Sequence, residues 1–84
     1  MNHPATTVYT KPACPQCTAT IRALNRRGVT YTKVDLTKDE SALAYVKGLG
    51  HLGAPVIVVD TATAPAHWYG FNPPLIDLHF GKAA

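Results

Sequence analysis

Short apolar runs alternate with longer amphipathic segments along the chain. Four of the short runs are rich in β-branched and aromatic residues and are bounded by proline, glycine or polar turn residues, a pattern typical of β-strands. One run, Val56–Val59, is continuously apolar, which predicts a strand that is covered on both faces. The predicted strands are Thr6–Thr10, Thr30–Leu36, Val56–Val59 and His67–Tyr69.

The first predicted helix runs from Gln16 to Arg27. Apolar or small side chains recur in it at Cys17, Ile21 and Leu24, which is the i, i+4, i+7 spacing of one helix face. Gly28 follows directly, where a helix commonly ends in a left-handed residue.

Two further helices are predicted from their starting residues. Thr37 and Glu40 fit a capping box that opens a helix ending near residues 48–50. Asn72 before Pro73 provides a cap residue and a proline suited to the first helical position. The predicted apolar faces are Ala42, Tyr45, Val46 and Leu49 for the second helix, and Leu75, Leu78 and His79, bordered by Ile76 and Phe80, for the third.

The resulting order, β-α-β-α-β-β-α, predicts a single α/β domain over residues 1–84. The first β-α-β unit is expected to form a right-handed parallel crossover. The last two strands are expected to add as an antiparallel hairpin, so that helices cover both sides of one four-stranded mixed sheet.

Composition and charge exclude several classes of function. The net charge is +3, and there is neither a long basic run nor basic–aromatic interleaving, so nucleic-acid binding is not expected. No apolar stretch reaches the roughly 18 residues of a membrane helix. The N-terminal residues lack the layout of a signal peptide, so we expect a cytoplasmic protein.

The two cysteines, Cys14 and Cys17, frame Pro15 and Gln16 between the first strand and the first helix. A thiol at a helix N-terminus faces unpaired N–H groups and the positive end of the helix dipole, which both favour the reactive thiolate. Cys17 lies one turn further in and is expected to be more buried. We therefore predict that Cys14 attacks a substrate disulfide and that Cys17 resolves the mixed disulfide. Pro15 fits the first helical position because it has no N–H group to leave unpaired.

Alternatives to redox chemistry remain at this point. A zinc site would need two more ligands, and no two histidines lie three to five positions apart, so no metal site or other cofactor is expected. A structurally inert pair of buried cysteines and a binding adaptor without catalytic turnover are further possibilities.

Two further residues have open roles. Lys11 is either a solvated loop charge or a group that stabilises the thiolate. Pro55 opens a core strand; if its peptide bond is cis, it would present the backbone of Ala54 beside the cysteines.

Three segments together resemble the NrdH-type redoxins, which are glutaredoxin-sized proteins that behave like thioredoxins. The segments are Thr10–Cys17 with its Cys-Pro-Gln-Cys motif, Ala54–Val56, and the Trp-Tyr-Gly-Phe sequence of residues 68–71. The resemblance implies a thioredoxin fold. It also implies a monomeric electron carrier that thioredoxin reductase reduces at the expense of NADPH and that in turn reduces a class Ib ribonucleotide reductase for deoxyribonucleotide synthesis.

The same resemblance assigns roles to individual residues. Cys14 and Cys17 are the attacking and the resolving thiol, and Pro55 is the cis-proline of the fold. The residues expected to bind substrate or partner are Lys11, Pro15, Gln16, Ala54, Pro55, Trp68, Gly70 and Phe71.

Glutathione-dependent glutaredoxins are the alternative reading, and the residues fit them less well. Their motif usually has tyrosine at the position of Gln16. Their glutathione site usually has two glycines followed by an aspartate, near the position where this chain has Asn72. The chain also departs from the NrdH pattern at Tyr69, Asn72 and Pro74, and the loop of residues 60–66 is long.

Overall fold

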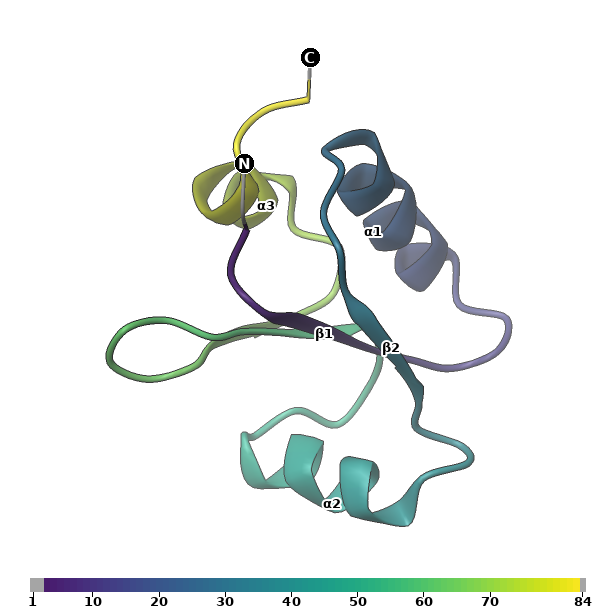
Figure 1. Cartoon of the computed structure of the whole chain (residues 1–84). Coiled ribbons are helices and arrows are strands. Elements are labelled where there is room, and N and C mark those ends of the chain that lie inside the picture. Colours follow the sequence, from purple (N-terminus) through teal and green to yellow (C-terminus); the bar gives the residue numbers. More distant parts are fainter. Residues whose placement is uncertain (1–2, 84) are drawn as a thin grey trace.

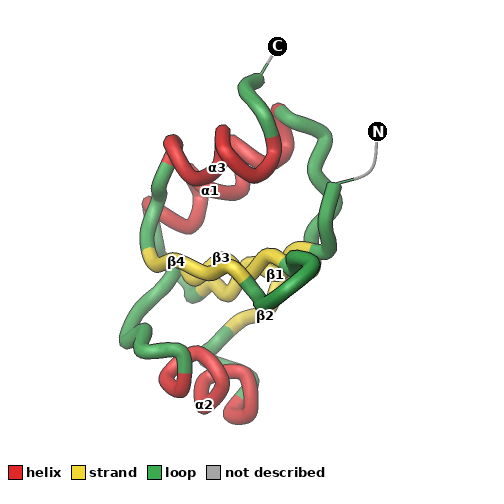
Figure 2. Tube along the Cα trace, turned by 90° about the vertical axis from the view of Figure 1, so that its left-hand side faces the viewer, coloured by secondary structure: helices red, strands yellow, loops and turns green. Residues whose placement is uncertain are grey.

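The computed structural model describes residues 3–83, and it shows one β-sheet with helices on both faces (Figures 1 and 2). None of the described helices is both long enough and apolar enough to span a bilayer. The elements in chain order are β1 (Thr6–Thr10), α1 (Pro15–Arg26), β2 (Thr32–Asp35), α2 (Glu40–Gly48), β3 (Val56–Val59), β4 (Ala66–Tyr69) and α3 (Pro73–Phe80).

The sheet has the strand order β2-β1-β3-β4. β1 pairs in parallel with β2 and antiparallel with β3, so that Val8 lies between Lys33 and Ile57. β3 and β4 form the antiparallel hairpin, in which Val56 lies opposite Tyr69. The four-stranded mixed sheet flanked by three helices is therefore confirmed.

Two apolar clusters hold the layers together. α1 and α3 cover one face of the sheet, and α2 covers the other (Figure 2). The cluster beneath α1 and α3 includes Val8, Leu24, Ile57 and Ile76, all fully buried. The cluster on the other face centres on Val46 of α2, so alternate residues of the buried strand β3 face opposite layers, as its continuously apolar sequence predicts.

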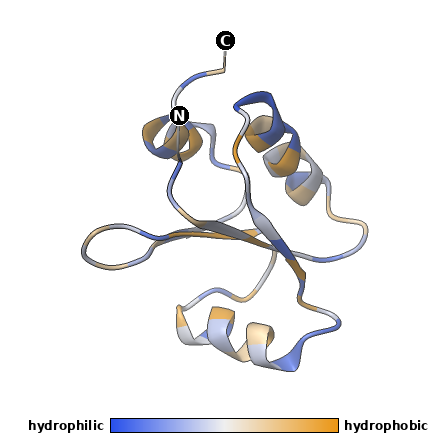
Figure 3. Cartoon of the chain, viewed as in Figure 1, coloured by the Kyte–Doolittle hydropathy of each residue, from blue (hydrophilic) through white to orange (hydrophobic). Residues whose placement is uncertain are grey.

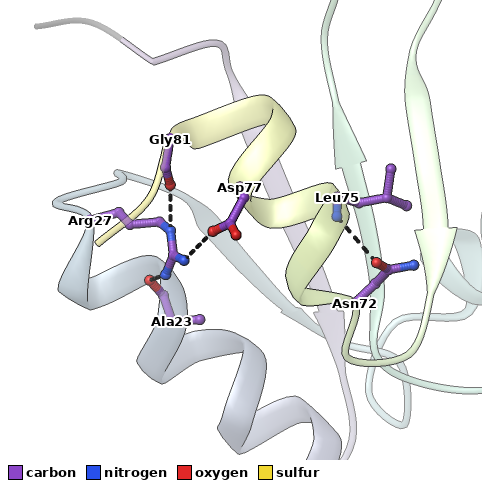
Figure 4. Close-up of polar contacts among 6 residues, drawn as sticks. All are labelled: Ala23, Arg27, Asn72, Leu75, Asp77 and Gly81. Carbon is purple, nitrogen blue, oxygen red and sulfur yellow. Dashed lines mark hydrogen bonds and ion pairs between the residues drawn. The ribbon is translucent and has the colours of Figure 1, made fainter. Parts of the chain in front are cut away.

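A partly buried arginine joins the helices that share one face. The last turn of α1 is hydrophilic in Figure 3, and Arg27 follows it as the cap residue. The Arg27 guanidinium donates to the carbonyl of Ala23 at 2.8 Å, to that of Gly81 at 2.7 Å and to the carboxylate of Asp77 at 2.6 Å (Figure 4). One side chain thus connects α1, α3 and the C-terminal segment.

Several boundaries differ from expectation by one or two residues: α1 ends at Arg26 rather than Arg27, β2 ends at Asp35 rather than Leu36, and β4 begins at Ala66 rather than His67. α1 begins at Pro15 rather than Gln16, and Gly28 after it has a φ of +67°, as a left-handed helix end requires. β2 begins at Thr32 rather than Thr30. Thr32 already lies opposite Thr7, near the start of β1, so the preceding residues have little strand left to pair with.

The predicted capping box of α2 is wrong. The cap residue is Asp39, whose carboxylate accepts the Ala42 N–H at 2.9 Å. Thr37 instead donates its N–H and its hydroxyl to Asp35, at 2.8 and 2.6 Å. The helix therefore starts only at Glu40. Tyr45, predicted on the buried face, is 43% exposed.

The predicted inner face of α3 is wrong at Leu78, whereas Leu75 packs against the core cluster and His79 stacks on Trp68. Ile76 and Phe80, one turn apart, are the buried pair, whereas Leu78 is 73% exposed. Six of the eight residues of this helix are apolar, so the sequence offers more than one stripe, and packing against the sheet selects one of them. The predicted cap holds, because the Asn72 side chain accepts the Leu75 N–H at 3.1 Å (Figure 4).

Candidate functional site

The turn between β1 and α1 places Cys14 at the start of the helix. Ala13 takes a positive φ of 55°, which turns the chain sharply after the strand. Cys14 then has an extended backbone as the cap residue, and Pro15 begins the helix. The predicted placement of the first cysteine ahead of α1 and of Cys17 inside its first turn is confirmed.

Cys14 and Cys17 form a disulfide, with their Cα atoms 5.2 Å apart. The Cys17 N–H donates to the Sγ of Cys14 at 3.1 Å, so the sulfur occupies the place of a capping oxygen. Cys17 is 4% exposed, whereas Cys14 is half-buried. In the reduced protein this arrangement gives Cys14 both access to a partner and a donor that favours its thiolate.

The loop before β3 lies against the disulfide. The Ala54–Pro55 peptide bond is cis, and the carbonyl oxygen of Ala54 lies 3.7 Å from the Sγ of Cys14. The carbonyl of Pro55 accepts the Gly70 N–H at 2.8 Å, which ties this loop to the end of β4. The structure therefore brings together Cys14, the cis-proline loop and the segment after β4.

Gln16 connects the cysteine motif to the segment that follows β4. Its Oε1 accepts the Phe71 N–H at 3.0 Å, across 55 positions of sequence. Gly70 has a φ of +88°, and a Cβ atom there would lie 3.1 Å from the same oxygen. Glycine at position 70 therefore permits both the positive φ of the turn and the close approach of the Gln16 side chain.

Lys11 and Trp68 have different surroundings. Lys11 is exposed and lines an open cleft of about 760 Å³ that also reaches both cysteines. Trp68 lies within β4 rather than in the following loop, and it is buried in the core cluster. Its ring stacks on that of His79, with centroids 5.3 Å apart. Two residues of the predicted segment reach the surface, Phe71 at 39% exposed and Tyr69 at 52% exposed.

Sequence reasoning missed several residues near the cysteines. Lys33 and Asp35 of β2 line the cleft beside the disulfide, a position that only the parallel pairing with β1 reveals. The pKa of Asp35 is lowered because its carboxylate accepts hydrogen bonds from the Thr37 hydroxyl and N–H. Leu52, in the loop before the cis-proline, is 90% exposed, and Tyr69, at the end of β4, is 52% exposed.

Tyr69 rests on the backbone that leads to the cis-proline. A Cβ atom on Gly53 would lie 2.8 Å from its ring, so a glycine is needed there for this contact. No periodic pattern marks Leu52, Gly53 or Tyr69 in the sequence. Among residues 3–83, no three or more His, Cys, Asp or Glu side chains gather where they could hold a metal ion.

Comparisons with known proteins agree with this geometry. Residues 6–62 match the glutaredoxin family. The glutaredoxin-like protein NrdH of Escherichia coli K12 is 31% identical over 74 residues, which cover 87% of this chain and 86% of the relative. The gene 56 protein of Mycobacterium phage L5 is 39% identical over 56 residues, covering 66% of this chain and 54% of that protein.

Solved structures of related proteins have the same fold as this chain. The E. coli NrdH-redoxin, described as a glutaredoxin-like protein with a thioredoxin-like activity profile, superimposes with a TM-score of 0.80 at 28% identity, covering 88% of this chain and 92% of that one. A glutaredoxin of Archaeoglobus fulgidus gives 0.70 at 22% identity, covering 90% and 85%, which supports the fold alone.

Proposed function

Because the chain belongs to the glutaredoxin family and, within it, to the NrdH-like redoxins, we propose that it carries electrons from thioredoxin reductase to protein disulfides. It is a thiol–disulfide oxidoreductase whose redox centre is the Cys14–Cys17 pair. The acceptor that we propose is the disulfide of a class Ib ribonucleotide reductase. This role belongs in the reducing cytoplasm and needs one copy of the chain.

The proposed exchange proceeds in two steps. The Cys14 thiolate attacks a sulfur of the substrate disulfide, forms a mixed disulfide and expels the other substrate thiolate, which takes up a proton. The Cys17 thiolate then attacks the Sγ of Cys14, releases the second substrate thiolate and leaves the disulfide of the structure. The burial of Cys17 and the greater exposure of the half-buried Cys14 support this division of roles.

One observation carries the choice of thioredoxin reductase over glutathione. Glutathione-dependent relatives usually have an acid near the position of Asn72. Here that side chain is neutral, and its oxygen is committed to the N-terminus of α3 through Leu75 (Figure 4). It therefore offers no carboxylate to a glutathione amino group.

Exposed apolar side chains support a protein as the substrate. Leu52 and Tyr69 lie on the segments that hold Ala54 and Gly70, so they border the cis-proline loop. Apolar surface next to a reactive group is typical of a protein-binding site. Tyr69 and Leu52 are therefore candidates for contacts with the partner.

The test compares two reducing systems on the same oxidised protein. NADPH oxidation is followed with thioredoxin reductase and insulin, and separately with glutathione and glutathione reductase. We expect turnover in the first system and little in the second. Brisk turnover with glutathione and none with thioredoxin reductase would overturn the proposal in favour of a glutaredoxin.

Asn72→Asp provides a matched variant for this comparison. Aspartate caps a helix as well as asparagine does, so α3 is expected to keep its start. The new carboxylate should raise the glutathione-dependent rate and leave the thioredoxin reductase-dependent rate unchanged. Cys14→Ser is the inactive control in both systems.

A further inference from the structure

The fold brings together two histidines that lie 16 positions apart in sequence. His51 is in the loop between α2 and β3, and His67 is in β4. The Nε2 of His51 and the Nδ1 of His67 are 2.8 Å apart, and the ring centroids are 4.9 Å apart at an interplanar angle of 77°. The two nitrogens therefore face each other at the edge of the sheet.

Both nitrogens are accessible to a metal ion that displaces the proton between them. His67 is exposed and His51 is half-buried, so solvent reaches the pair. Burial, and then the neighbouring charge of His67, lower the pKa of His51. In the structure one facing nitrogen donates a hydrogen bond to the other, so a bound metal ion would replace this shared proton and both rings would then carry their protons on the outer nitrogens.

We propose that His51 and His67 form a binding site for a divalent late transition metal ion, with Cu²⁺ the best fit. Metal–imidazole bonds are about 2.0 Å long, so two donors 2.8 Å apart enclose an angle of about 90° at the metal. That is the angle between adjacent ligands in the square-planar geometry that Cu²⁺ adopts. A tetrahedral Zn²⁺ site needs the nitrogens about 3.3 Å apart, so the rings would have to separate.

The site has two protein ligands among the described residues, because no third Cys, His, Asp or Glu joins them. Water completes the coordination, and the ion exchanges freely. Imidazole binds first-row divalent ions most strongly at Cu²⁺, so the affinity should fall from Cu²⁺ to Zn²⁺.

The pair also connects two segments of the redox site. His51 precedes Leu52 and Gly53, which lead to the cis-proline, and it lines a pocket of about 370 Å³ with Tyr69. His67 lies two residues before Tyr69 on the same strand. A metal ion held by both histidines would therefore fasten the loop before Pro55 to β4 and stabilise the folded protein.

The experiment uses tag-free protein with the Cys14–Cys17 disulfide intact, because free thiolates bind these metals themselves. His3 is replaced in every sample as His3→Gln, since a histidine near a chain terminus can bind Cu²⁺ independently. Cu²⁺ is titrated at about pH 7.5, where imidazole is neutral. Calorimetry gives the affinity and stoichiometry, electron paramagnetic resonance reports the coordinating nitrogens, and thermal unfolding reports the stabilisation.

We expect one Cu²⁺ per chain, a signal from two imidazole nitrogens and a raised Tm. Adding His51→Gln or His67→Gln should weaken binding by about tenfold or more, at least as much as losing an outer-shell partner of a metal site. His79→Gln, which alters a histidine stacked on Trp68, should leave binding unchanged. Absence of saturable binding, or binding in His51→Gln and His67→Gln that is as tight as in the parent protein, would overturn the proposal. Neither outcome depends on the reductase that the protein uses.

Discussion

Gln16 is the residue that links the cysteine motif to the segment after β4. Gln16 lies between the two cysteines in sequence, and its side-chain oxygen accepts the Phe71 N–H. A residue at this position that lacked an acceptor would leave that N–H to solvent and would free the Gly70–Phe71 turn. The identity of the residue between the cysteines thus affects the partner surface as well as the thiols.

Replacing Gln16 should therefore affect protein substrates more than small ones. Gln16→Ala is expected to raise the KM for a protein disulfide several-fold while the rate with a small aromatic disulfide changes little. The hydrogen bond is exposed, so the free energy of unfolding should fall by about 1 kcal/mol or less. Steady-state kinetics with the two substrates measure the difference.

Asn25→Ala is the matched control for Gln16→Ala. It removes another exposed side-chain amide from α1, one that accepts the Tyr31 hydroxyl at 3.1 Å at the opposite end of the helix. Equal effects of the two variants on the KM for the protein substrate would show that the Gln16–Phe71 bond has no special role.

At the scale of the element, the start of α2 depends on Asp39. Hydrogen bonds from the Ala42 N–H and then from the Ser41 hydroxyl lower the pKa of this carboxyl below 3.8. A depressed pKa in the folded state means that the carboxylate stabilises the fold above the pKa of the unfolded chain. This stabilisation is lost as the pH falls through the folded-state value.

Asp39→Ala should therefore lower the Tm at pH 7, and the difference from the parent protein should shrink as the pH falls below 3.8. Asp39→Asn keeps an acceptor for the Ala42 N–H and should lose less stability at pH 7. Thermal unfolding across this pH range measures both variants. A difference that stayed constant at low pH would contradict the assignment of Asp39 as a charged cap.

The helices show where local sequence determines structure and where it does not. The Asn72–Pro73 start and the Gly28 end were predictable, because each depends on the backbone preference of one or two residues. The start of α2 was not, because Thr37 and Asp39 both fit a cap, and the competing partner Asp35 becomes visible only in the fold. The buried face of α3 is likewise chosen by its packing.

At the scale of the whole molecule, Arg27 joins α1, α3 and the C-terminal segment through three hydrogen bonds (Figure 4). Its side chain is only 11% exposed, and its ion pair with Asp77 is more shielded than a surface pair. Removing the guanidinium leaves the partners of Arg27 without their donor.

Arg27→Met should lower the free energy of unfolding by about 2 kcal/mol, because a partly buried charge-assisted hydrogen bond is worth more than a neutral one. Arg26→Met, at an exposed position next to it, should change stability little. Urea unfolding of both variants gives the comparison. Similar losses in the two variants would argue against the role of Arg27 as a connection between helices.

The candidate site was predictable in part. The cysteine spacing, the helix start and Pro55 follow from local chemistry and from the family resemblance. The Gln16–Phe71 bond, the cleft position of Lys33 and the contact between His51 and His67 arise from segments that meet only in three dimensions. No local pattern encodes these contacts, since each depends on strand order and register.

The central claim is that Cys14 attacks the substrate and that Cys17 resolves the intermediate. The most direct measurement is to mix the reduced single variants with an excess of a protein disulfide and to identify covalent adducts by mass spectrometry over time. Cys17→Ser is predicted to form a stable mixed disulfide at Cys14, because the Cys14 thiol is partly exposed and accepts the N–H of residue 17, and no second thiol remains to resolve the adduct.

Cys14→Ser is predicted to react at least about tenfold more slowly, because the remaining thiol is only 4% exposed. Accumulation of the Cys14 adduct in one variant and almost none in the other would match the predicted roles. A Cys14→Ser protein that forms its adduct at Cys17 as fast as its counterpart would contradict the account.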